Sequence, residues 1–180
     1  LDHDIDTGKI IDRKTFAIPD DADVEYVYDG LMRLGAQLCV ETVDRVIATD
    51  GQVPAMPQPT TADLKAAPKI FKETCQIQWD QAAVKIHNFV RGLSPYPGTW
   101  TTFVASDGKE AVLKIFRTEL SGLHSDGPVG SLVHAGRQLG VTVAGGEVLL
   151  IDELQLAGKR RMAVADFLNG VKDIDSCVVK

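Results

Sequence analysis

Apolar and polar residues alternate with different periods in two parts of the chain. From Val24 to Ile47, apolar residues recur every three or four positions, and this spacing predicts a helix with a candidate break near Gly35. Aspartates suited to a helix N-terminus precede it, at 20, 21 and 23. The segment Lys9–Ile18, stopped by Pro19, predicts a strand. A strand and one helix cannot cover both faces of a sheet, so we expect the end of a larger α/β domain.

The second part begins with another helical stripe and then changes to short strands. Apolar residues from Trp79 to Leu93 follow helical spacing, and Pro95 and Pro97 end the pattern. Tight turns at Asp107-Gly108 and Gly145-Gly146 separate several short apolar runs. These runs predict strands at 99–105, 111–120, 130–135, 139–144 and 147–154, and a short helix at 163–168. Five short antiparallel strands indicate a small closed barrel.

Charge is divided unevenly between the two parts. The 180 residues carry a formal net charge of −6, made up of −7 over residues 1–50 and +1 over residues 51–180. Residues 51–68 open the second part, and the three closely spaced prolines at 54, 57 and 59 predict an extended linker without ladder hydrogen bonds. The acidity therefore belongs to the first part, and it does not exclude a nucleic-acid partner for the second.

Composition excludes several classes of protein. Hydrophobic residues make up 44% of the chain, too many for a disordered protein, and no apolar run approaches the roughly 20 residues of a membrane span. The three cysteines (Cys39, Cys75 and Cys177) are scattered, which predicts reduced, buried thiols in a cytosolic protein. The four histidines show no ligand spacing, so we expect no metal.

Two motifs are candidates for chemistry. Asp6-Thr7-Gly8 combines a carboxylate with a glycine that lets backbone approach a ligand, although such a tripeptide is most often only a turn. The basic run Lys159, Arg160 and Arg161 is either solvated surface, the commoner case, or a phosphate contact. Trp79 and Trp100 favour core positions over stacking platforms.

Four stretches resemble the C-terminal part of the methionyl-tRNA formyltransferases. Ile5–Gly8 is similar to the L-D-T-G that closes the catalytic signature of that family. Ala67–Glu73 with Ile77–Trp79 resembles A-x-K-I-x-K-E followed by I-D-W, and Ile86–Trp100 resembles I-x-N-x-I-R-x-L-x-P-x-P-G-A-W. Leu154–Gly170 resembles L-Q-x-x-G-K-x-x-M and F-L-x-G. The sequence departs from these motifs at two positions, Gln78 for Asp and Thr99 for Ala.

The resemblance implies an architecture and an activity. Residues 1–50 would be the α/β remnant of a Rossmann-like formyltransferase domain, 51–68 the linker, and 69–180 an OB-like, mainly β barrel of five to six strands with short helices. The implied reaction moves a formyl group from 10-formyltetrahydrofolate, the co-substrate, to the α-amine of methionyl initiator tRNA. No metal and no membrane are implied, and we expect a cytoplasmic monomer.

The resemblance also assigns roles to residues. Asp6 takes the place of the catalytic aspartate, and Asp4, Ile5 and Asp6 that of the loop touching the pterin. The expected tRNA contacts are Lys69, Lys72, Arg91, Lys159, Arg160 and Arg161. The family's catalytic Asn and His precede these motifs, and the chain starts inside a motif without Met. We therefore expect a fragment that is inactive alone.

Two alternatives remain open at this point. Folate-dependent sugar-nucleotide formyltransferases share the D-x-G and R-x-x-P-x-P-G elements, although the basic block at 154–162 favours tRNA. A freestanding OB-type nucleic-acid binding module would use the same barrel without chemistry.

Overall fold

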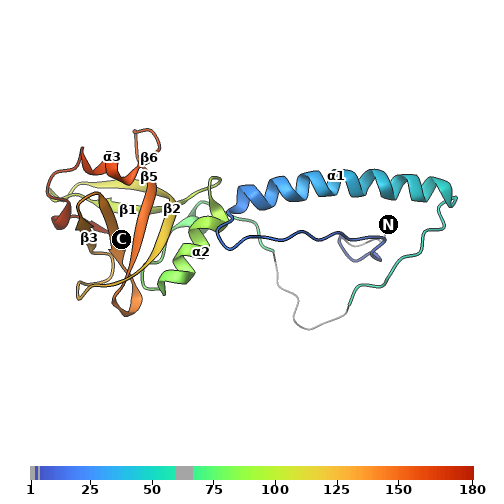
Figure 1. Cartoon of the computed structure of the whole chain (residues 1–180), viewed down its shortest axis with the longest axis horizontal. Helices are drawn as coiled ribbons and strands as arrows, with labels where there is room; N and C mark the ends of the chain where they lie inside the picture. The colour runs from blue at the N-terminus through green and yellow to red at the C-terminus, as the bar shows by residue number, and fades with distance from the viewer. Residues whose placement is uncertain (1–2, 4, 60–66) are drawn as a thin grey trace. The chain divides into compact units, whose positions relative to one another are not determined.

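The computed structural model describes residues 3, 5–59 and 67–180. The chain forms two compact units, one of Leu1–Ala22 with Tyr26–Lys69 and the other of Asp23–Glu25 with Ile70–Lys180. The first unit is dominated by one long helix and the second by a curled sheet, as the ribbon shows (Figure 1).

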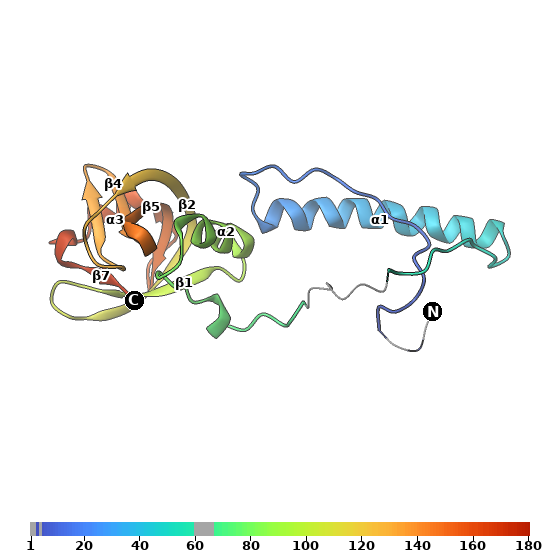
Figure 2. The same ribbon diagram turned by 90° about the horizontal axis from the view of Figure 1, so that it is seen from below.

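The second unit is built on an antiparallel sheet in the order β3-β4-β5-β2-β1-β7, with β6 paired to β5. Strands that follow one another in the chain are not all adjacent in the sheet, because β5 lies between β4 and β2. The strands are β1 (Thr99–Val104), β2 (Glu110–His124), β3 (Leu132–Ala135), β4 (Gln138–Thr142), β5 (Glu147–Leu156), β6 (Met162–Ala163) and β7 (Val178–Val179). Strand β2 is the longest, and irregularities in its register with β5 let the sheet bend strongly (Figure 2).

The two edges of this sheet meet. Ser131, just before β3, forms an isolated antiparallel bridge with Val178 of β7, and the Val179 amide donates to the Gly130 carbonyl at 2.9 Å. Gly130 has φ = +87°, and a Cβ there would lie 2.3 Å from the Val179 carbonyl oxygen. Only glycine fits this closure, which makes the sheet barrel-like.

One helix covers the sheet and another closes its end. Helix α2 (Ala83–Leu93) packs on β2 through four buried residues at helical spacing, Ala83, Ile86, Val90 and Leu93. The helix start lacks a side-chain cap of its own, and the Glu147 carboxylate of β5 instead accepts the Ala83 amide at 3.1 Å. Helix α3 (Val164–Leu168) packs on β5, and Phe167 meets Phe103 of β1 edge to face. Short 3₁₀ turns lie at Glu73–Cys75, Ala144–Gly146 and Ile174–Ser176.

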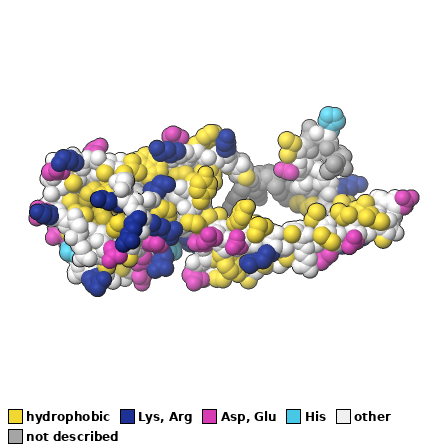
Figure 3. Space-filling model, turned by 90° about the horizontal axis from the view of Figure 1, so that it is seen from above, with side chains coloured by type: hydrophobic (Ala, Val, Ile, Leu, Met, Phe, Trp, Pro, Cys, Tyr) yellow, Lys and Arg dark blue, Asp and Glu magenta, His cyan; other side chains and the backbone are white. Residues whose placement is uncertain are grey.

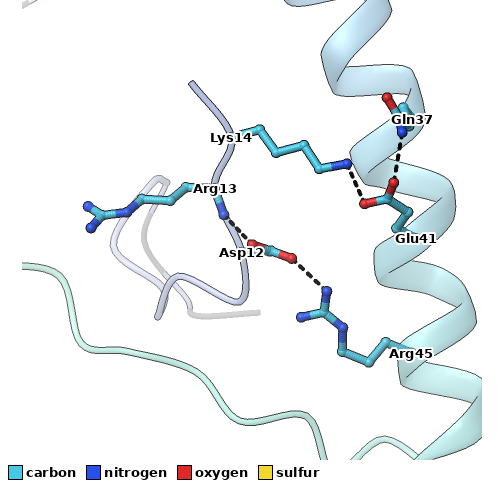
Figure 4. A network of polar contacts seen from close by, with 6 residues as sticks. All are labelled: Asp12, Arg13, Lys14, Gln37, Glu41 and Arg45. Atoms are coloured by element: carbon cyan, nitrogen blue, oxygen red, sulfur yellow. Dashed lines mark hydrogen bonds and ion pairs between the residues drawn. The ribbon is translucent and has the colours of Figure 1, made fainter. Parts of the chain in front are cut away.

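In the first unit, an extended segment runs along helix α1 (Val24–Ala48) and is tied to it by ion pairs (Figure 4). The Asp12 carboxylate accepts from Arg45 at 2.6 Å, and the Lys14 ammonium donates to Glu41 at 2.5 Å. Gln37 donates to the other oxygen of Glu41 at 3.0 Å.

The first unit corrects four sequence predictions. The predicted strand at 9–18 is wrong, because only Ile10 pairs, with Met56, and the described residues offer no further partner strand. Ile10 and Met56 exchange two backbone hydrogen bonds of 2.8 Å. The prediction that the proline-rich segment makes no ladder hydrogen bonds is therefore also wrong, because Met56 is not a proline and keeps its amide donor. Helix α1 is confirmed, but it runs through Gly35 without a break. Its residues include Cys39, which is exposed rather than buried.

Helix α1 buries none of its residues. Its apolar stripe is only partly covered by the extended segment, and Tyr28 and Ile47 remain 67% and 73% exposed. The second unit follows the predictions more closely. All five strands and both helices are present, Cys75, Cys177 and Trp79 are buried, and Trp100 is only half-buried.

Candidate functional site

The Asp6-Thr7-Gly8 motif forms a turn that the first unit holds in a defined position. Asp6 has φ = +60°, a left-handed conformation that aspartate adopts more readily than most residues. The Gln58 amide donates to the carbonyl oxygens of both Asp6 and Gly8, each at 2.7 Å. The proline-rich segment therefore fixes the turn that carries the predicted catalytic carboxylate.

A hollow of about 650 Å³ lies beside this turn, lined by residues of the turn, of the end of α1 and of 51–55. Asp6 and Ile5 both line it, and Ile5 is 89% exposed. Asp4, the third residue predicted to touch the pterin, lies outside the described residues. The hollow has the size of a small-molecule site, and Asp6 and Ile5 stay predicted contacts of the pterin.

The ion pairs of the first unit keep the extended segment against the helix. Hydrogen bonds from the Arg45 guanidinium and the Arg13 amide hold the pKa of Asp12 below its ordinary value (Figure 4). The Lys14 ammonium does the same to the pKa of Glu41. Both carboxylates are thus negative at neutral pH, and they position the segment rather than move protons.

The predicted basic run occupies the turn between β5 and β6. Gly158 has φ = +77°, and the turn is closed by the Lys159 amide on the Leu156 carbonyl at 2.9 Å. The Gln155 side chain also donates to the Lys159 carbonyl at 2.8 Å. Lys159 and Arg160 are exposed on this ordered turn.

Arg161 is held more tightly than its two neighbours. Its guanidinium pairs with Glu153 at 2.6 Å and lies 4.3 Å from the centre of the Phe116 ring. Such a cation–π contact restrains the side chain without neutralising it. Phe116 in turn lies against Gly98, where a Cβ would be 3.3 Å from the ring. The turn is therefore anchored to the loop that follows α2.

The other predicted tRNA contacts are partly brought to the same end of the sheet. The Lys72 carbonyl accepts the Trp100 indole at 2.8 Å, which places Lys72 at the start of β1. Arg91 lies in the last turn of α2 and its guanidinium donates to Asn88 at 2.8 Å. Lys69 is the last residue of the first unit. Figure 3 shows Lys and Arg side chains on the second unit interspersed with acidic ones.

His87 does not add to this positive charge. Its Nδ1 lies 3.0 Å from the Thr118 hydroxyl, and burial, followed by the charge of Arg91, lowers its pKa. The imidazole is therefore neutral at physiological pH.

Sequence reasoning missed one concave surface of the second unit, where apolar side chains and polar amide groups lie together. A pocket between the segment 74–78 and α2 is lined by three glutamines, and only the alternation of buried residues before the helix could have indicated it. Across residues 3, 5–59 and 67–180 there is no group of three or more His, Cys, Asp or Glu able to hold a metal. No helix in the same ranges has the length and apolar character to cross a membrane.

The second unit and its motifs define a protein class. The model of the formyl transferase C-terminal domain matches residues 69–172, more than half of the chain, and the chain belongs to that family. The methionyl-tRNA formyltransferase of Parabacteroides distasonis is 48% identical over 97% of the chain and 54% of its own length. That of Phocaeicola vulgatus is 42% identical over 98% of the chain and 55% of its own length. The chain thus spans about half the length of these relatives.

Solved structures share the fold at much lower identity. A variant of HypX from Aquifex aeolicus superposes with a TM-score of 0.59 at 20% identity, covering 95% of this chain and 31% of HypX. HypX in complex with tetrahydrofolic acid gives a TM-score of 0.58 at 17% identity, covering 93% and 28%. At this identity the likeness shows the fold alone.

Proposed function

We propose that the protein containing this chain transfers a formyl group from 10-formyltetrahydrofolate to the α-amine of methionyl initiator tRNA. The observation that carries the proposal is the 48% identity to a methionyl-tRNA formyltransferase along 97% of the chain. The relatives are named methionyl-tRNA formyltransferases, so they do not favour a sugar-nucleotide formyltransferase or a freestanding binding module.

Each part of the chain takes a role in this proposal. Residues 1–50 form the end of a Rossmann-like catalytic domain, 51–68 the linker, and 69–180 an OB-like domain that holds the tRNA. The uncovered apolar side of α1 supports the first assignment, because exposed residues such as Tyr28 and Ile47 are what a helix shows when the sheet it covers is elsewhere in a protein.

The chemistry gives Asp6 a positioning or proton-relay task. The amine nitrogen attacks the formyl carbon, a tetrahedral intermediate forms, and the bond from that carbon to N10 of the folate then breaks. The amine loses a proton and N10 gains one. A carboxylate on the Asp6 turn can orient an imidazole and stabilise its charged form for this transfer. In the family pattern that imidazole comes from a segment preceding the motif.

The β5–β6 turn is the proposed phosphate contact of the second unit. Lys159 and Arg160 are exposed on a turn whose backbone is ordered by hydrogen bonds, so little backbone entropy is lost on binding. Arg161 presents its charge from a restrained position over Phe116. Lys72 and Arg91 extend the same end of the sheet, and Lys69 precedes it.

The test measures binding of the full chain to initiator tRNA at several salt concentrations. Lys159→Ala with Arg160→Ala is expected to weaken binding and to reduce the salt slope by about two, one for each lost phosphate contact. Lys109→Ala with Arg137→Ala is the matched control, because these exposed residues lie in other turns. If the Lys159→Ala, Arg160→Ala variant kept its affinity and salt slope, the basic turn would not be a phosphate contact. The complete protein should formylate methionyl initiator tRNA, and absence of that activity would overturn the proposed reaction.

A further inference from the structure

The segment entering the second unit separates its side chains into two rows. Its inward row is buried in the barrel core and consists of Cys75, Ile77 and Trp79. Its outward row is polar and consists of Thr74, Gln76 and Gln78. The Ile77 amide donates to the Trp100 carbonyl at 2.9 Å, and the Trp79 indole donates to Thr101 at 2.9 Å. Because the inward row is fixed to β1, the outward row is held in one place as well.

Helix α2 supplies the opposite wall. Lys85 and Phe89 lie one turn apart on the helix and face the outward row across a pocket of about 260 Å³. Ile86 adds apolar surface, and Gln81 lies at the end where the helix begins. The Gln81 carbonyl accepts the Ala144 amide at 3.2 Å, so the backbone at this end is anchored to the turn before β5.

The polar groups around this pocket are available for a ligand. Among the described residues, the side-chain amides of Gln76, Gln78 and Gln81 find no hydrogen-bond partner, and neither does the Lys85 ammonium. Of residues 3, 5–59 and 67–180, no acidic side chain lines the pocket. At position 78 the chain carries glutamine where the motif it resembles has aspartate, so a negative charge is absent from the wall.

We infer that this pocket binds an unpaired nucleotide of the tRNA, with the base between the glutamine row and Phe89 and the phosphate at Lys85. The inference rests on the proposed function and assigns to it a second contact, on α2 rather than on the β5–β6 turn.

The chemistry of the lining matches that ligand. An amide side chain has one donor and one acceptor group, the pattern found on the edge of a base. An aromatic ring gives an unstacked base a surface to stack on, and a lysine near it contacts the backbone phosphate. At about 260 Å³ the pocket lies below the usual range for drug-sized ligands, about 300–1,000 Å³, which favours a single base over a larger molecule.

The first experiment compares Lys85→Gln with Lys172→Gln in the full chain. Both replace an exposed lysine by the same neutral residue, but Lys172 does not line the pocket. Lys85→Gln is expected to weaken initiator tRNA binding about tenfold, because the ammonium that contacts the phosphate is lost. Lys172→Gln should bind as the unsubstituted chain does. If both variants bind equally well while the basic-turn variant is impaired, the pocket is not a contact, although the proposed function stands.

The second experiment observes the pocket without tRNA. Glutamine side-chain amide signals of the full chain are followed by NMR during titration with a single-stranded RNA trinucleotide, with adenosine monophosphate and with tetrahydrofolate. We expect saturable shifts at Gln76 and Gln78 with the trinucleotide and weaker ones with the mononucleotide. No shift with either RNA probe, or a shift with tetrahydrofolate alone, would overturn the inference whatever the result of the tRNA assay.

Discussion

The threonine at the centre of β1 offers a sharp test of how the second unit is held together. Thr101 is fully buried, and its hydroxyl accepts the Trp79 indole at 2.9 Å and donates to the Lys180 carbonyl at 2.6 Å. One side chain therefore joins the segment entering the unit, the sheet and the end of the chain. Thr101→Val keeps the shape of the side chain and removes both hydrogen bonds.

The expected loss of stability in Thr101→Val depends on the hydrogen bonds that Trp79 and Lys180 retain. The Trp79 indole is buried and becomes unpaired, which costs about 1–3 kcal/mol. The Lys180 carbonyl keeps the Thr102 amide at 3.3 Å, so its loss is an ordinary hydrogen bond of about 0.5–1.5 kcal/mol. The added methyl group returns about 0.8 kcal/mol. The net effect is a lower free energy of unfolding by about 2 kcal/mol, or a urea midpoint about 1 M lower.

Tryptophan fluorescence in urea measures this directly, because both tryptophans of the chain, Trp79 and Trp100, lie in the second unit. Thr102→Val is the matched control on the same strand, at a half-buried position on the opposite face. Thr101→Ser keeps the hydroxyl and should be more stable than Thr101→Val despite losing a methyl group. Equal midpoints for the two valine variants, or a serine variant weaker than Thr101→Val, would refute the importance of these hydrogen bonds.

Three further outcomes are expected. Gly130→Ala should destabilise the second unit by about 3 kcal/mol or more, since it adds a backbone clash at the barrel closure to an unfavourable positive φ, whereas Gly108→Ala, with open space around it, should cost only about 1–2 kcal/mol; equal losses in urea unfolding would exclude the clash. In the complete protein, Asp6→Asn should lower formyl-transfer turnover at least about tenfold, and near-normal turnover would remove its catalytic assignment. Lys14 depresses the pKa of Glu41 in the folded state. The ion pair between them therefore stabilises the fold at pH values above the ordinary glutamate pKa, and this stabilisation disappears as the pH falls through the depressed pKa. Hydrogen exchange of α1 should therefore be slower in the unsubstituted chain than in Glu41→Gln at about pH 6, and this difference should shrink as the pH falls below the ordinary glutamate pKa; a difference that does not change with pH would contradict the pairing.

The elements that the sequence predicts best are those whose pattern is set by their own burial. Helix α2 and the strands of the barrel match because each alternates or repeats apolar residues toward one core. Strand β2 nevertheless continues to His124, four residues beyond the predicted end. Its last three residues, 122–124, are exposed and show no alternation of buried and exposed positions, and His124 pairs with Glu147 of β5.

Features that depend on distant partners could not be predicted. Strand β7 is two residues long and exists because it pairs with β1 and meets Gly130 across the barrel. The cap of α2 comes from Glu147, 64 residues away in the chain. The predicted strand at 9–18 fails for the converse reason, since an extended apolar pattern forms a ladder only where a second strand is available.

The candidate sites also combine features that the local sequence shows with features that depend on tertiary contacts. The basic run at 159–161 is visible as a motif, but only the structure shows that Arg161 pairs with Glu153 and lies over Phe116. In the segment before α2, buried and solvent-facing side chains alternate. The buried row fastens the segment to β1, so the exposed row can change composition without cost to the core. A substitution in that row, such as the glutamine at position 78 in place of aspartate, can therefore alter the charge of the pocket while the fold stays the same.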